Sequence, residues 1–188
     1  MRQLSEIDVP DTKPATEWVR GRALQKISPK PRHSVLQRWI ATWLDAWVGR
    51  RGCVGTELDV KIARPGEPLR PLVPDVCYLS FERWSREQFE TDEVPRAAPE
   101  IVVEILSPDD RRIDLDDKLD VYLQAGTRLV LVVDPRRRSV ETVSGSALSQ
   151  ATHDVYGVGA TIAFDDAGFE GLSLVLYELF SAIDFRRQ

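Results

Sequence analysis

The chain has 188 residues, of which 43% are hydrophobic and 29% charged, and its formal net charge is −5. This length and balance predict a single globular domain with a sizeable core; no apolar run is long enough to span a membrane, and the polar N-terminus lacks an apolar signal core, so a cytoplasmic protein is expected. The cysteines Cys53 and Cys77 form no CxxC pair, which excludes a zinc site built by cysteines alone.

In chain order, residues 1–15 show little periodicity and predict a flexible arm, and residues 16–188 are expected to form the single domain. Residues 17–27 predict a β hairpin that turns near Gly21. Apolar side chains at spacings of three and four predict a helix over residues 31–48.

The middle of the chain predicts three strands, over residues 53–62, 72–79 and 100–106. A short helix and a loop are expected in the polar stretch 82–98. The run 100–106 is apolar on both faces apart from Glu104, which is typical of a central strand covered on both sides.

The last third predicts a helix over residues 114–125, a buried strand over 129–133, further strands and turns, and a short helix over 177–183. Asp114 is expected to cap the first of these helices. The order of elements predicts an α/β fold of the mixed α+β kind: a mixed β-sheet flanked by helices, with extra β hairpins before and after it.

Charge is distributed unevenly along the chain. Residues 1–51 hold ten Lys and Arg against five Asp and Glu, whereas residues 52–188 hold fifteen against twenty-five. The basic first third suits contacts with phosphates, and so do the pair Arg111-Arg112 and the run 136–138. A solvated surface explains the same distribution, so both interpretations stay open.

Two acidic residues occur in apolar strands. Glu104 lies inside a buried strand, where a carboxylate costs free energy unless it is paired or bound to a cation; an ion pair with an arginine is the structural alternative. Asp75 follows Pro74 and could merely begin its strand. Two isolated acids on adjacent apolar strands nevertheless make a hard-oxygen site that suits Mg²⁺ or Mn²⁺.

Lys118 lies on the apolar face of its predicted helix, with Leu115, Tyr122 and Ala125. A solvent-facing lysine needs no such position, so Lys118 is predicted to stabilise charge on a phosphate or to orient the attacking water. A lysine that snorkels from the edge of the apolar stripe is the alternative.

Short motifs follow one another in a characteristic order and spacing. They are Glu17-x-x-x-Gly21, Ser28-Pro29-x-x-x-His33, Pro74-Asp75-Val76, the run from Pro99 through Glu104 to Pro108, Asp114-x-x-x-Lys118-x-x-x-Tyr122 and Val133-Asp134-Pro135. In this order they resemble the Uma-type family of putative restriction endonucleases, a bacterial family of the PD-(D/E)XK nuclease superfamily that was long a domain of unknown function. The resemblance covers nearly the whole chain.

The resemblance implies a restriction-endonuclease-like core and an endonuclease that uses Mg²⁺, or alternatively Mn²⁺, to hydrolyse DNA. Asp75 and Glu104 would bind the metal, with the backbone carbonyl of Ile105 as a further ligand. The motif's lysine normally follows the second acid by two residues, where this chain has Leu106. The resemblance implies that in this family the lysine lies on the following helix, which would make it Lys118.

Glu17, His33 and Asp114 are additional candidates for the site. Glu17 could add an acid near the metal, or it could be an ordinary residue of a strand surface. His33 lies at the start of the first predicted helix, where a capping or surface role is the alternative. Asp114 is expected to hold Lys118 one helical turn away.

Three functions are compatible with these features. The first is a DNA endonuclease with Asp75, Glu104 and Lys118 as catalytic residues; because a lone nuclease domain often cuts a duplex as a pair, a homodimer is expected. The second is a catalytically inactive nucleic-acid-binding or dimerisation module that keeps the nuclease fold, favoured by Leu106 and by the net acidity. The third is a different phosphoesterase or a protein-interaction domain. No separate DNA-reading module is recognisable.

Overall fold

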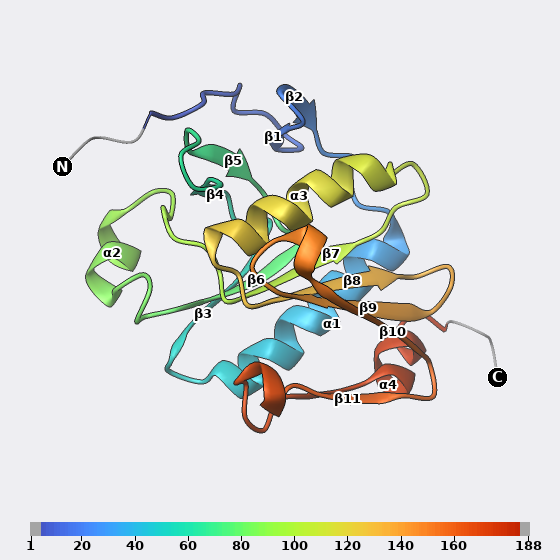
Figure 1. Cartoon of the computed structure of the whole chain (residues 1–188). Coiled ribbons are helices and arrows are strands. Elements are labelled where there is room, and N and C mark those ends of the chain that lie inside the picture. The colour runs from blue at the N-terminus through green and yellow to red at the C-terminus, as the bar shows by residue number, and fades with distance from the viewer. Residues whose placement is uncertain (1–4, 185–188) are drawn as a thin grey trace.

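The central feature of the computed structural model, which describes residues 5–184, is a six-stranded mixed sheet in the order β10-β9-β8-β7-β6-β3 (Figure 1). Its strands are β3 (Gly52–Thr56), β6 (Val76–Ser80), β7 (Ile101–Ile105), β8 (Leu129–Asp134), β9 (Ser139–Ser144) and β10 (Thr152–Gly157). β7 and β8 run parallel and the other neighbours antiparallel. A parallel pair needs a long crossover, and α3 (Arg112–Ala125) supplies it. The predicted mixed sheet with flanking helices is confirmed.

Helices cover both faces of the sheet, α3 on one side and α1 (Pro31–Val48) on the other (Figure 1). α1 has the predicted bounds, and its stripe of Leu36, Ile40 and Leu44 is fully buried against the sheet. Burying each such side chain stabilises the fold by roughly 1.5–3 kcal/mol. The same layer is completed by β11 (Thr161–Ala163), β12 (Ser173–Val175) and α4 (Leu176–Ser181).

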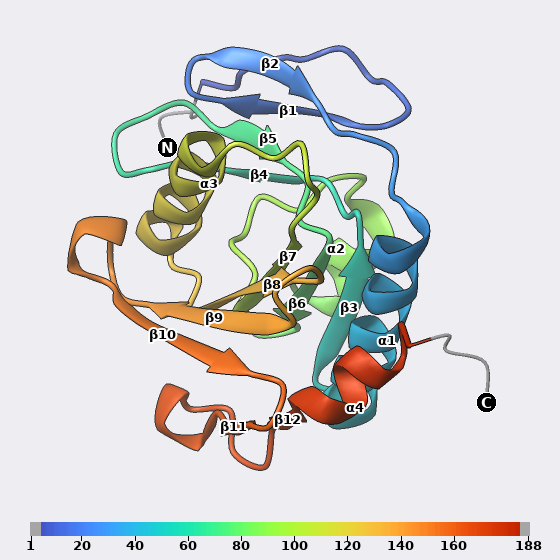
Figure 2. The same ribbon diagram turned by 90° about the vertical axis from the view of Figure 1, so that its right-hand side faces the viewer.

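Two small hairpins lie beside α3 (Figure 2). They are β1 (Thr16–Val19) with β2 (Arg22–Gln25), and β4 (Val60–Ile62) with β5 (Arg70–Leu72). The first confirms the predicted hairpin. Its two turn residues, Arg20 and Gly21, have φ of +50° and +75°, as a two-residue turn between twisted antiparallel strands requires.

Several predicted boundaries are wrong. The strand predicted over 53–62 is divided between β3 and β4, because the chain turns at Glu57 with a φ of +50°. The strand predicted over 72–79 is divided between β5 and β6; the break falls at Pro74, which has no N–H to donate to a sheet.

The remaining elements are short. A helix predicted in the polar stretch 82–98 is present as α2 (Arg86–Thr91), which Ser85 caps. Two single turns of 3₁₀ helix, η1 (Leu148–Gln150) and η2 (Asp165–Ala167), occur in the connections of the last third. The terminal helix expected over 177–183 lies slightly earlier, as α4.

The predicted N-terminal arm lies partly outside the described residues, which begin at Ser5. Backbone hydrogen bonds join Ser5 and Ile7 to Leu69. Among the helices of residues 5–184, none has the length and apolarity needed to cross a membrane.

Candidate functional site

Strand register makes Asp75 and Glu104 neighbours. β6 and β7 are antiparallel, and Val76 pairs with Val103. Asp75 lies one residue before Val76, just ahead of β6, and Glu104 lies one residue after Val103, within β7. The antiparallel register therefore places Asp75 and Glu104 opposite each other. The backbone N–H of Ile105 donates to Asp75 Oδ2 at 2.7 Å, which ties the two segments together at this point.

Asp75 is a buried carboxylate surrounded by donors. His33 Nε2 lies 3.2 Å from Oδ2, and Lys26 Nζ lies 2.7 Å from Oδ1. Burial by itself would raise the pKa of Asp75, but the hydrogen bond with His33 and the charge of Lys26 outweigh it and hold that pKa below its usual range. Asp75 is therefore kept ionised.

Glu104 projects from β7 toward α3 and is equally buried. Its Oε1 lies 2.7 Å from Lys118 Nζ and accepts a hydrogen bond of 2.9 Å from the Tyr122 hydroxyl. Burial raises the pKa of Glu104 to about 7, against the lowering effect of the Lys118 charge. The ion pair that the sequence left open is thus formed with a lysine and not with an arginine.

Lys118 joins Glu104 to a second buried acid, Glu17 of β1, at 2.9 Å. Glu17 also accepts the backbone N–H of Val73 at 2.7 Å, so this carboxylate has fixed partners on both sides. Burial would lower the pKa of Lys118, but Glu104 and Glu17 outweigh it and raise that pKa. The buried ammonium keeps its charge at neutral pH, which suits a stabiliser of negative charge and not a base.

The structure thus brings together five residues named from the sequence: Glu17, His33, Asp75, Glu104 and Lys118. The sequence reasoning missed Lys26, whose ammonium also donates to the carbonyl of Val73 at 2.8 Å. Strand alternation was the available signal, because it places Lys26 on the same face as Leu24, two positions earlier, which packs against the core.

Asp114 does not make the predicted contact with Lys118. α3 begins at Arg112, so Asp114 lies in the first turn and does not cap the helix. Its carboxylate accepts a hydrogen bond from Arg22 at 3.0 Å and lies 3.6 Å from Arg20. An (i, i+4) pair contributes only about 0.2–0.5 kcal/mol. Two buried acids therefore hold Lys118 more strongly than Asp114 could.

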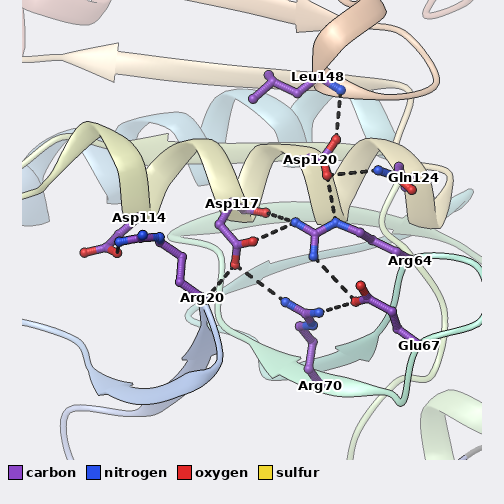
Figure 3. Close-up of polar contacts among 9 residues, drawn as sticks. All are labelled: Arg20, Arg64, Glu67, Arg70, Asp114, Asp117, Asp120, Gln124 and Leu148. Atoms are coloured by element: carbon purple, nitrogen blue, oxygen red, sulfur yellow. Dashed lines mark hydrogen bonds and ion pairs between the residues drawn. The ribbon is translucent and has the colours of Figure 1, made fainter.

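The outer side of α3 is fixed by a separate polar network (Figure 3). Arg64 donates to Asp117 at 2.6 Å and to Asp120 at 2.7 Å, and Arg70 lies 3.5 Å from Asp117. Asp117 also accepts the backbone N–H of Arg20 at 2.8 Å. These contacts join α3 to both hairpins, which sets the rotation of the helix and directs its inner side chains toward the sheet.

A cavity of about 330 Å³ opens at this edge of the sheet and is lined by all five of these site residues, together with Lys26 and Ile105. Its walls carry six carboxylates against four Lys and Arg side chains, an excess of negative charge that a divalent cation would offset.

The donor set fits Mg²⁺ or Mn²⁺ with a condition. Within residues 5–184, no three acidic, histidine or cysteine side chains gather closely enough to hold a metal by themselves. Mg²⁺ is usually held by one or two carboxylates, with water and substrate phosphates completing its shell. The adjacent carboxylates of Asp75 and Glu104, beside the Ile105 backbone, are of that kind. Binding of the metal at Asp75 Oδ1 would require the Lys26 ammonium, now 2.7 Å from that oxygen, to move away.

Comparisons with known proteins identify a family and a similar structure. A family model described as a putative restriction endonuclease matches residues 2–162. Among solved structures, the chain is similar to a putative nuclease belonging to DUF820 from Anabaena variabilis, with a TM-score of 0.79 and 26% sequence identity over 93% of this chain and 94% of that chain. No curated protein matched the chain.

Proposed function

Since the chain belongs to the Uma2 family of putative restriction endonucleases, we propose that it is a metal-dependent endonuclease that hydrolyses phosphodiester bonds of DNA, with Asp75, Glu104 and Lys118 as its catalytic residues. The family and the restriction-endonuclease-like fold expected from the sequence are confirmed. The activity itself, the metal and the roles of these residues are the proposal.

One observation carries the proposal: two carboxylates and a lysine, all buried, converge on one open cavity from the segment before β6, from β7 and from α3. Buried charges of this kind are costly, and a purely structural role would be served as well by apolar side chains. Charged groups that are both desolvated and accessible from a cavity are characteristic of functional sites.

Each residue has a distinct role in this mechanism. Asp75, Glu104 and the backbone carbonyl of Ile105 would hold the metal, which supplies Lewis-acid stabilisation of the phosphate when bound. His33 keeps Asp75 ionised. Lys118 places a permanent positive charge where the phosphate gains negative charge during the reaction.

The net reaction is hydrolysis. The oxygen of a water molecule forms a bond to phosphorus, and the bond from phosphorus to one sugar oxygen breaks. The water's hydroxyl remains on the phosphate monoester, and its other proton ends on the released sugar oxygen. No redox partner or cosubstrate is required.

The test is cleavage of a mixed pool of supercoiled plasmid, linear duplex and branched DNA in magnesium, manganese or EDTA. Wild-type protein should cut in one of the metals and not in EDTA, and Asp75→Ala and Glu104→Ala should be inactive. Glu100→Ala is the matched control, because Glu100 is equally buried but bonds to Ser80, outside the cavity. Full activity of both site variants would remove the proposed site.

A second candidate is the inactive module that binds DNA without cutting it. It is favoured by the lysine contacts, because Lys26 and Lys118 already compensate both carboxylates. Leu106 at the position of the usual lysine agrees with it. This reading predicts DNA binding that EDTA does not weaken, and no cleavage in either metal.

A further inference from the structure

Asp114, which lines the cavity, lies within 4.0 Å of three arginines. Arg22 donates to its carboxylate at 3.0 Å, Arg20 lies at 3.6 Å and Arg111 at 4.0 Å. Arg20 lies in the turn of the β1–β2 hairpin, Arg22 is the first residue of β2, and Arg111 directly precedes α3. Segments about ninety residues apart are thus brought to one carboxylate.

This cluster has more positive charge than its carboxylate can neutralise. Three guanidinium groups face one carboxylate, which leaves a net charge of +2. The Asp114 side chain is 11% exposed, whereas those of Arg20, Arg22 and Arg111 are 39%, 48% and 62% exposed. Each guanidinium has five N–H donors, so most of the donors of this cluster remain available to a ligand.

Two of the arginines face the cavity that holds the carboxylates. Arg22 and Arg111 line it together with Asp75, Glu104 and Lys118. Strand alternation explains the direction of Arg22, since it lies on the same side of β2 as Leu24. A planar guanidinium at the edge of a site for phosphodiesters has the shape and charge to bind phosphate oxygens in pairs.

We propose that Arg22 and Arg111, positioned by Asp114, bind a backbone phosphate of DNA next to the phosphate that is cleaved, with Arg20 as the third charge of the cluster. This inference rests on the proposed nuclease function, because it takes DNA as the ligand. Arg22 and Arg111 would thus bind substrate on a positively charged wall of the cavity, whereas Glu17, Asp75 and Glu104 make another part of its lining acidic. Asp109 and Asp110 also line the cavity, and the first of them is paired with Lys30.

The experiment measures binding of a short fluorescein-labelled duplex by anisotropy over a series of salt concentrations, without added metal. All proteins carry Glu104→Gln to prevent cutting, and cleavage is measured separately in the unmodified background. Arg22→Ala and Arg111→Ala should each lower the salt slope by about one and weaken binding about tenfold at low salt. Arg22→Lys should keep the slope, because the charge remains.

Arg96→Ala is the matched control. Arg96 is also an exposed arginine that bonds to a carboxylate, that of Glu6, but it does not line the cavity. Its substitution should change neither slope nor affinity. Circular dichroism checks that each variant is folded.

The outcomes separate this inference from the nuclease proposal. DNA cleavage by wild type, together with unchanged binding by Arg22→Ala and Arg111→Ala, would overturn the proposed phosphate-binding role of these arginines and would still support the nuclease function. Binding that depends on both arginines, with no cleavage in any metal, would support the phosphate-binding role and overturn the proposed nuclease activity. Absence of both binding and cleavage overturns both.

Discussion

Lys118→Met removes the ammonium that two buried acids share. Lys118 Nζ lies 2.7 Å from Glu104 and 2.9 Å from Glu17, and the side chains of all three are less than a tenth exposed. Methionine fills nearly the same volume, so the loss is mainly electrostatic. Removing one partner of a buried ion pair typically costs about 3–5 kcal/mol, and we expect the free energy of unfolding to fall by that amount near neutral pH.

The cost should depend on pH. Burial already raises the pKa of Glu104 from 4.5 to about 7, and loss of the Lys118 charge would raise it further. An acid with a raised pKa in the folded state holds its proton where the unfolded chain has released it, so stability falls as pH rises above 4.5. The variant should therefore be nearest to wild type at about pH 5 and furthest from it at about pH 8.

Urea unfolding followed by tryptophan fluorescence measures both effects, and the chain has five tryptophans as reporters. Lys30→Met is the matched control: Lys30 pairs with Asp109 on the surface, where both side chains are more than half exposed. Its loss should cost less than about 1 kcal/mol. A similarly small cost for Lys118→Met at about pH 8, or the same cost at both pH values, would refute this reasoning.

Three further predictions concern neighbouring groups. Tyr122→Phe deletes the hydroxyl that donates to Glu104 at 2.9 Å and should lower the free energy of unfolding by about 1.5–3 kcal/mol in the same titration; an unchanged midpoint would contradict the hydrogen bond. Because Lys26 and the hydrogen bond with His33 hold the pKa of Asp75 below 3.8 despite its burial, its contribution is present above that pH and lost below it. The stability advantage of wild type over Asp75→Asn should therefore shrink as pH falls below 3.8, and an advantage that is constant with pH would argue against this assignment. Burial raises the pKa of the Cys77 thiol to about 12, so iodoacetamide at about pH 8 should label Cys77 only after unfolding, and mass spectrometry of the folded protein would reveal any earlier labelling.

Local sequence pattern was sufficient where the physical signal was local. Glu104 was recognisable because a single acid interrupts a strand that is apolar on both faces, and β7 is the buried strand expected there. Lys118 was recognisable because helical periodicity places it with Leu115 and Tyr122, and it is buried beside them. Both predictions required only the period of one element.

Contacts between distant segments could not be derived in the same way. Lys26 meets Asp75 across 49 positions of sequence; strand alternation indicates which face Lys26 lies on, but it does not identify a partner so distant in the chain. The (i, i+4) spacing on the helix predicts a contact between Asp114 and Lys118. In the structure Asp114 instead bonds to Arg22, which the β1–β2 hairpin brings to it from a distant part of the chain. The break at Glu57 is hidden because polar and apolar residues alternate loosely on both sides of it, and the break at Pro74 because it interrupts a largely apolar run.

The most direct measurement is the rate at which wild type and Glu104→Gln cut supercoiled plasmid in magnesium. Glutamine keeps the shape of the side chain and an acceptor for the Tyr122 hydroxyl, while it removes the charge needed at the site. We expect the rate to fall at least about a hundredfold in Glu104→Gln and to remain near wild type in Glu100→Gln. Equal cleavage by wild type and Glu104→Gln would contradict the assignment of this cavity as a nuclease site.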